Sequence, residues 1–104
     1  MDRGFGVERV VDADRIVVRV RGEIDLMTAG SLRDELCDAV KQSPEVIVDL
    51  QGVGFLDSTG VRALFDAYRA ANELGHRFYV TGARQWVAKV LDVTGVGKLL
   101  APPA

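Results

Sequence analysis

The pattern that most constrains this fold is a strand pattern in the middle of the chain that leads within a few residues into a helix pattern. Between Glu45 and Leu50, Val46 and Val48 alternate with Ile47, the period of two that is typical of a strand. Further on, apolar residues recur at helical spacing, at Val61, Leu64, Phe65, Tyr68 and Ala71. Such strand–helix–strand units predict parallel strands joined by right-handed crossovers.

Three further strands are predicted from the same period of two. Ile16, Val18 and Val20 indicate one strand, residues 5–11 a weaker one, and residues 77–81 a short one. The first two strands are expected to form a hairpin, since the aspartates between them favour a tight turn.

Two further helices are predicted from apolar spacing and from their end signals. One follows Thr28, a candidate N-cap, and ends before Pro44. The other lies around Val87 and Leu91 and is closed by Gly95. The buried stripe of the first helix is expected at Ala29, Leu32, Leu36, Ala39 and Val40.

Glycines mark the expected interruptions. Residues 22–27 are predicted to form a loop, and Gly52 and Gly54 are predicted to break the strand pattern before the central helix. In that helix, which Gly75 is suited to end, we expect Leu64 and Phe65 to be buried. We also expect Cys37 and Trp86 to pack, fully or partly, against the domain.

The order of these elements predicts an α/β fold with a four-stranded mixed sheet and an antiparallel N-terminal edge strand. Arg19 and Arg21 stand on the outer side of their strand, which favours helices mainly on one face of the sheet. With 104 residues and no linker or repeat, the chain is expected to form a single domain over residues 1–104.

Charge and cysteine content exclude several classes of partner. The 13 basic and 15 acidic residues give a net charge of −2, which argues against nucleic acid and against an anionic membrane surface. Residues 1–6 contain no apolar run, and no apolar segment is long enough to span a bilayer. A lone cysteine, Cys37, fits a reducing compartment, so a cytoplasmic location is expected.

Ser58 is the most informative polar residue, because it follows a strand and precedes the central helix. Its hydroxyl either caps that helix, which is worth about 1 kcal/mol, or accepts a phosphate beside the positive end of the helix dipole. Thr59 is the rival acceptor. Asp25 and Asp57 each precede a helix and are expected near Ser58, as loop and cap acids or as the source of the local field.

Catalysis has little support in the sequence. A nucleophile elbow around Ser58 would need glycine where Leu56 stands. His76, the one candidate base, would lie about 20 Å away along the helix. We therefore predict no catalytic residue and no enzymatic activity.

Cofactor motifs are incomplete as well. After Gly52 and Gly54, a dinucleotide fingerprint would need glycine in place of Asp57, and the Gly-Lys pair ending at Lys98 is followed by leucine rather than serine or threonine. His76 and Cys37 stand alone, so no metal and no cofactor are predicted.

Three segments in the right order resemble the STAS domains of bacterial anti-sigma factor antagonists. They are residues 48–60, which end in Asp-Ser-Thr-Gly, residues 22–29, which contain Gly-Glu-Ile-Asp, and residues 91–98. The resemblance implies partner switching. The unphosphorylated protein would bind an anti-sigma factor that is itself a serine kinase and would thereby free sigma factor. Phosphorylation of Ser58 would abolish binding, and a phosphatase would restore it.

The resemblance also implies a partner surface, made of Asp25, Leu26, Met27, Thr28, Asp57, Ser58, Thr59 and Gly60. STAS domains serve other assemblies too. The alternative function is therefore an adaptor subunit of a lipid-transport or stress-signalling complex that works without phosphorylation.

Overall fold

The computed structural model describes residues 4–103, so residues 1–3 and 104 of the expected domain, including half of the segment 1–6 that has no apolar run, lie outside the description. The elements follow the predicted order, with a short helix added near the end. They are β1 (Gly6–Asp12), β2 (Arg15–Ile24), α1 (Ala29–Gln42), β3 (Glu45–Leu56), α2 (Ser58–Glu73), β4 (Arg77–Thr81), α3 (Gln85–Thr94) and α4 (Val96–Leu99).

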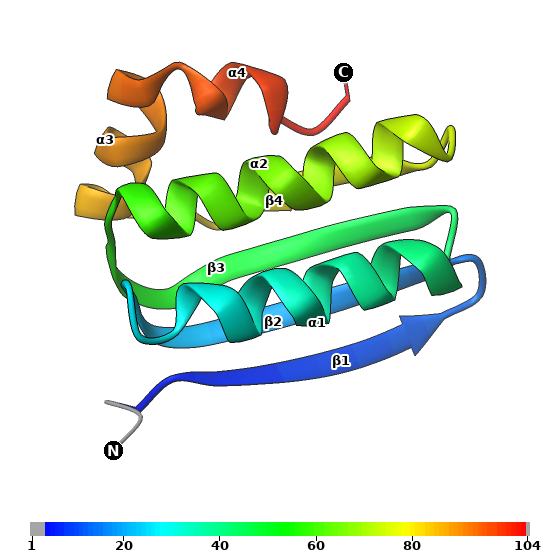
Figure 1. The fold of residues 1–104 in the computed structure, drawn as a ribbon, viewed down its shortest axis with the longest axis horizontal. Helices are drawn as coiled ribbons and strands as arrows, with labels where there is room; N and C mark the ends of the chain where they lie inside the picture. The colour runs from blue at the N-terminus through cyan, green and yellow to red at the C-terminus, as the bar shows by residue number, and fades with distance from the viewer. Residues whose placement is uncertain (1–3, 104) are drawn as a thin grey trace.

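The four strands form one mixed sheet in the order β1-β2-β3-β4. β1 pairs antiparallel with β2, whereas β2, β3 and β4 run parallel. Helices α1 and α2 lie side by side over the same face of the sheet, and α3 and α4 lie beyond α2 (Figure 1). The predicted fold class is therefore confirmed, including the antiparallel edge strand.

The core fills the space between the sheet and its helices. Val18, Val48 and Leu50 on the sheet and Leu36 and Leu64 on the helices are fully buried. Leu64 is buried as expected, but the prediction for Phe65 was wrong in degree. Phe65 is only half-buried, because it lies at the edge of the apolar stripe, where its ring stacks on Tyr68 with centroids 6.3 Å apart.

Two strands are longer than the glycine pattern predicted. Gly22 belongs to β2, and Gly52 and Gly54 belong to β3. The pairing of β2 with β3 absorbs the irregularity through register shifts around Arg21 and Gly22. Gly22 has φ +95, and a Cβ there would lie 2.7 Å from the Phe5 backbone, so only glycine fits this close approach. Because of this lengthening, β2 ends at Ile24 and β3 ends at Leu56, directly before Asp25 and Asp57.

Trp86 packs only partly against the domain, which is the weaker form of the sequence prediction. Its side chain is 54% exposed, because it points away from the buried Val87 and Leu91 of α3. Cys37 is half-buried beside its stripe, and burial raises the pKa of its thiol, which suits a packing residue. None of the helices described between residues 4 and 103 is long and apolar enough to cross a membrane.

Candidate functional site at the carboxyl edge of the sheet

The site forms where two neighbouring parallel strands end side by side. The Asp57 N–H, just after β3, donates a hydrogen bond of 3.2 Å to the carbonyl oxygen of Ile24, the last residue of β2. This bond joins the loop before α1 to the start of α2. The two helices therefore begin at the same edge of the sheet, as the sequence predicted for Asp25 and Asp57.

The loop before α1 is held by hydrogen bonds of its own. Asp25 is only 8% exposed, and its Oδ1 accepts the N–H of Met27 at 2.9 Å. The Thr28 hydroxyl accepts the N–H of Asp25 at 3.0 Å and donates to the carbonyl of Glu23 at 2.9 Å. Thr28 stands at the predicted N-cap position, but its side chain makes no cap bond with α1. Its hydroxyl fixes the loop instead.

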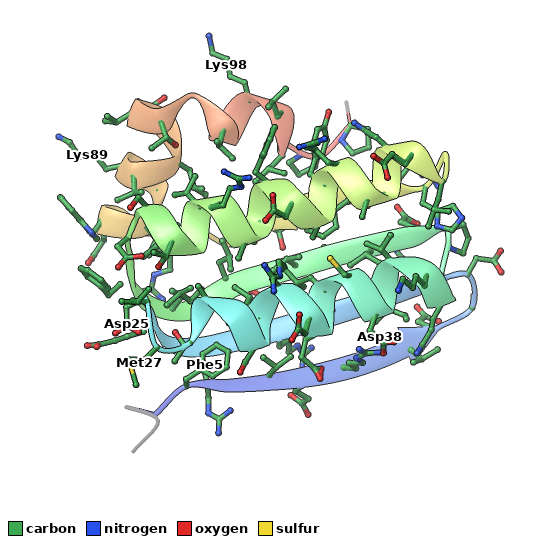
Figure 2. The ribbon with its side chains drawn as sticks, viewed as in Figure 1. Phe5, Asp25, Met27, Asp38, Lys89 and Lys98 are labelled. Carbon is green, nitrogen blue, oxygen red and sulfur yellow. The ribbon has the colours of Figure 1, made fainter. Side chains whose placement is uncertain are left out.

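This fixed loop presents two large apolar side chains to solvent. Leu26 is 77% exposed and Met27 is 82% exposed. Figure 2 places Met27 beside Asp25 at the end of the molecule where α1 begins. Exposed apolar side chains on a hydrogen-bonded loop are suited to contact a partner, because the backbone that carries them loses little conformational entropy on binding.

Asp57, not Ser58, caps α2. The Asp57 Oδ1 accepts the N–H of Thr59 at 2.9 Å and the N–H of Gly60 at 3.3 Å. Ser58 is the first residue of the helix and is exposed. Among the described residues, none forms a hydrogen bond with the Ser58 hydroxyl, whereas the Asp57 carboxylate accepts the N–H groups of Thr59 and Gly60. The capping role considered for Ser58 is therefore wrong, because a carboxylate one residue earlier performs it.

Thr59 is less available than Ser58. It is half-buried, and its hydroxyl donates a hydrogen bond to the same Asp57 Oδ1. Its side chain lines a small hollow of about 80 Å³ between α1 and α2, together with Gly30, Arg33 and Arg62. A reaction at the Thr59 hydroxyl would have to break this bond first.

Gly60 lets α2 begin close to the strand ends. A Cβ at this position would lie 2.3 Å from Leu56 Cδ1 and 2.6 Å from Ile24 Cγ2. Both of those side chains are buried and cannot retreat. Of the eight residues expected to form the partner surface, Leu26, Met27 and Ser58 face solvent. Gly60 is buried, and its role is to let the start of α2 pack closely on the strand ends.

The sequence analysis did not assign two apolar residues, Phe55 and Trp86, to this edge. Phe55, near the end of β3, is exposed, and the ring of Trp86 lines a hollow of about 190 Å³ with Gly52 and Gly54. Helical spacing could have shown the exposure of Trp86. It stands seven residues before Val93, which is also exposed, and so it shares the outer face of α3 rather than the buried stripe.

The electrostatic character of the edge is acidic. Asp25 follows Ile24, whose carbonyl oxygen accepts the N–H of Asp57. Asp57 directly precedes Ser58, and its carboxylate already accepts the backbone N–H groups of Thr59 and Gly60. A phosphate on Ser58 would therefore find fewer open donors than the sequence analysis assumed. Within residues 4–103 no three His, Cys, Asp or Glu side chains are grouped so as to hold a metal ion.

His76 lies away from this edge. It follows the far end of α2, and its Nδ1 lies 2.8 Å from the carbonyl oxygen of Val40. Its ring is therefore placed for a structural hydrogen bond, and the geometry offers Ser58 no base from this residue.

Comparison with known proteins gives one consistent result. A family model described as Mlab, STAS domain matches residues 8–101. An anti-sigma-B factor antagonist of Staphylococcus epidermidis is 27% identical over 97 residues, which is 92% of this chain and 90% of the relative. An anti-sigma factor antagonist from Mycobacterium paratuberculosis superimposes with a TM-score of 0.85 at 24% identity, covering 97% of this chain and 86% of that one.

The anti-sigma factor antagonist SpoIIAA is a further structural neighbour. Its unphosphorylated form has a TM-score of 0.77 at 25% identity, with 91% of this chain and 84% of that chain covered. Its phosphorylated form, from Bacillus, has a TM-score of 0.70 at 24% identity, with 91% and 86% covered. Because a single family model spans nearly all of the described chain, this protein belongs to the STAS domain family.

Proposed function

We propose that this protein is an anti-sigma factor antagonist that is switched by phosphorylation of Ser58. The observation that carries the proposal is the placement of Ser58. Its exposed hydroxyl begins α2 at the same edge as the exposed Leu26 and Met27. Similarity to antagonists from Staphylococcus epidermidis and to SpoIIAA, which is known with and without phosphate, supports the same role.

In the unphosphorylated state the carboxyl edge binds an anti-sigma factor that is a serine kinase, and sigma factor is released. Leu26 and Met27 supply apolar contact, and the buried hydrogen bonds of the Asp25 loop keep them in place. The chain acts as a single cytoplasmic domain over residues 1–104, and neither nucleic acid nor a membrane takes part. No cofactor or catalytic residue is required of it.

Phosphorylation ends the binding by electrostatics. A phosphate adds about −1.5 to −2 charges at neutral pH. At Ser58 this charge stands beside Asp57, whose carboxylate already occupies two of the helix N–H donors. A partner surface would have to desolvate the phosphate next to the half-buried carboxylate of Asp57, which is costly. A phosphatase removes the group and restores binding.

Ser58 rather than Thr59 is the acceptor in this proposal. Both hydroxyls lie in the first turn of α2, but Thr59 Oγ1 is hydrogen-bonded to Asp57 and half-buried. Mass spectrometry of the protein after incubation with ATP and the cognate kinase should find phosphate on Ser58. Phosphate on Thr59 alone would contradict the assignment.

Calorimetry with the kinase tests the switch itself. Ser58→Ala should bind like the unmodified protein, because the cap of α2 comes from Asp57 and not from Ser58. Ser58→Asp should bind at least about tenfold more weakly, a difference of about 1.4 kcal/mol. Equal affinity of the two variants would sink the proposal.

A second candidate is an adaptor subunit of a lipid-transport or stress-signalling complex that uses the same edge without phosphorylation. The specific observation in its favour is that the matching family model is described as Mlab, STAS domain, and not as an antagonist. A pull-down that recovers a partner without kinase activity, with equal retention by Ser58→Ala and Ser58→Asp, would favour the adaptor.

A further inference from the structure

The face of the sheet that no helix covers carries an ordered pattern of side chains. On each strand the residues that alternate with the buried ones point to this open face, for example Val17 between Ile16 and Val18. The strand register groups them into three rows that cross the sheet from β1 to β4. We name them the outer charged row (Asp12, Arg15, Glu45, Arg77), the apolar row (Val10, Val17, Ile47, Tyr79) and the inner charged row (Glu8, Arg19, Asp49, Thr81).

The outer charged row alternates in sign across all four strands, and the inner one alternates from β1 to β3 and ends in the uncharged Thr81. Within the chain this allows lateral pairs, such as Arg15 with Asp12 at 3.8 Å and Arg77 with Glu45 at 3.6 Å. Both side chains of the first pair are largely exposed, and pairs of that kind contribute only about 0–1 kcal/mol each. In the second pair Arg77 is exposed, whereas the Glu45 side chain is only 17% exposed. The apolar row lies between the two charged rows, and the Val10 side chain is 38% exposed.

We propose that the open face binds a second copy of this chain, face to face, around a two-fold axis that runs along the strands between β2 and β3. Such an axis places β1 over β4 of the other copy and β2 over β3. Asp12 then faces Arg77, and Arg15 faces Glu45. The same operation sets Arg19 against Asp49, while Val10 meets Tyr79 and Val17 meets Ile47. Every cation of the three rows thus opposes an anion, as an isologous interface requires.

The charge pattern favours this axis over the alternative two-fold axis in the same plane. A two-fold axis perpendicular to the strands would lay the outer charged row on the inner one. Arg15 would then face Arg19, and Glu45 would face Asp49, which places like charges opposite each other at both positions. Only the axis along the strands turns the alternation into attraction, and it also matches the aligned mode of sheet packing.

The small area of the open face determines how tightly two copies are expected to bind each other. With strands about 4.8 Å apart, the rows span only about 14 Å across the sheet. The buried area therefore falls below the roughly 800 Å² per partner of a stable complex, so the dimer should be weak and reversible. Because the axis runs along the strands, both carboxyl edges point to the same end of the dimer and Ser58 stays accessible on each copy.

Sedimentation equilibrium of the full chain tests the proposal. Between about 20 µM and about 1 mM, a range suited to a weak complex, the average mass should rise above the monomer value of 11.3 kDa. Asp12→Lys and Arg77→Glu, two exposed positions on the outermost strands, should each weaken association at least about tenfold. A wild-type chain that stays monomeric over the whole range would overturn the proposal without reference to any variant.

The decisive measurement mixes the two variants in equal amounts. In a mixed dimer, the lysine at position 12 of one copy faces the glutamate at position 77 of the other copy. The symmetry-related contact keeps the original pair, Arg77 with Asp12. Association should therefore return in the mixture, although the lateral pairs inside each chain stay broken. Failure to recover would overturn the two-fold arrangement.

Two further variants separate the open face from general surface effects. Val10→Lys should abolish association, since it buries a charge in the apolar row. The matched change Val93→Lys, at an exposed valine of α3 away from the open face, should leave association unchanged. Equal loss by both variants would contradict the proposed face.

Discussion

The starts of α1 and α2 lie at the same edge of the sheet but are built in opposite ways. At α1 the hydroxyl of the N-cap residue Thr28 turns back to hold the Asp25 loop, and the helix receives no side-chain cap. At α2 the carboxylate of Asp57 caps the helix directly, and no loop intervenes after β3. One start therefore presents apolar contact area, and the other presents a single hydroxyl on a stabilised helix end.

This difference shows how a residue at a helix start can be modified without destabilising the fold. Ser58, the proposed site of modification, contributes no cap bond, because its neighbour Asp57 supplies the cap. Leu26 and Met27, the proposed contact residues, likewise contribute little to the core, since most of their surface is exposed. On this proposal stability and recognition depend on different side chains at the same edge, and substitutions at Leu64, Asp57, Thr28 and Leu26 separate the two.

The largest effect is expected for Leu64→Ala, which removes core contacts of α2 well beyond its first turn. Leu64 is fully buried, and such truncations cost about 2–5 kcal/mol in the free energy of unfolding. Urea denaturation followed by circular dichroism measures the change. A loss below about 1 kcal/mol would mean that α2 is held chiefly by its cap and not by the core.

Asp57→Ala should come next, with a loss of about 1–2 kcal/mol, because N-cap carboxylates are worth this much. The Thr59 and Gly60 N–H groups would lose their acceptor. Asp57→Asn, which keeps an acceptor oxygen, is the matched control and should retain most of the stability. If the Ala and Asn variants unfold at the same urea concentration, Asp57 does not act as a cap.

Thr28→Val should cost about 1 kcal/mol, since it removes the hydroxyl that binds Asp25 and Glu23 while keeping the side-chain shape. Its second effect is on the loop. Hydrogen exchange at the Met27 amide, which is bonded to Asp25, should become faster in this variant. Unchanged exchange there would show that the loop is fixed without Thr28.

Leu26→Ala should change stability least, within about 0.5 kcal/mol, as expected of an exposed position. In contrast, the affinity for the kinase should fall by about 1 kcal/mol or more if Leu26 is buried in the complex. Leu74→Ala, at an exposed leucine at the far end of α2, is the control and should alter neither quantity much. Equal binding by the two variants would remove Leu26 from the partner surface.

Local patterns in the sequence were enough for most of the fold. The alternation at Ile16, Val18 and Val20 and the stripe through Leu64 report which side of each element is buried, and burial depends on that spacing. End signals also worked, since Pro44 follows the end of α1 and Gly95 adopts the left-handed conformation that ends α3. The glycines at positions 22, 52 and 54 did not end their strands as predicted, because register shifts between β2 and β3 accommodate them within the pairing.

The sequence by itself determined the element order, the parallel strands and the placement of Ser58 at a helix start, because each follows from the chemistry of adjacent residues. Only the tertiary structure decided that Asp57 is the cap, that Thr28 holds the Asp25 loop and that Trp86 faces solvent. Several neighbouring side chains could each have satisfied the same backbone donors. The choice among them depends on the angle at which α1 and α2 meet the strand ends, and that angle is set by the packing of distant core residues.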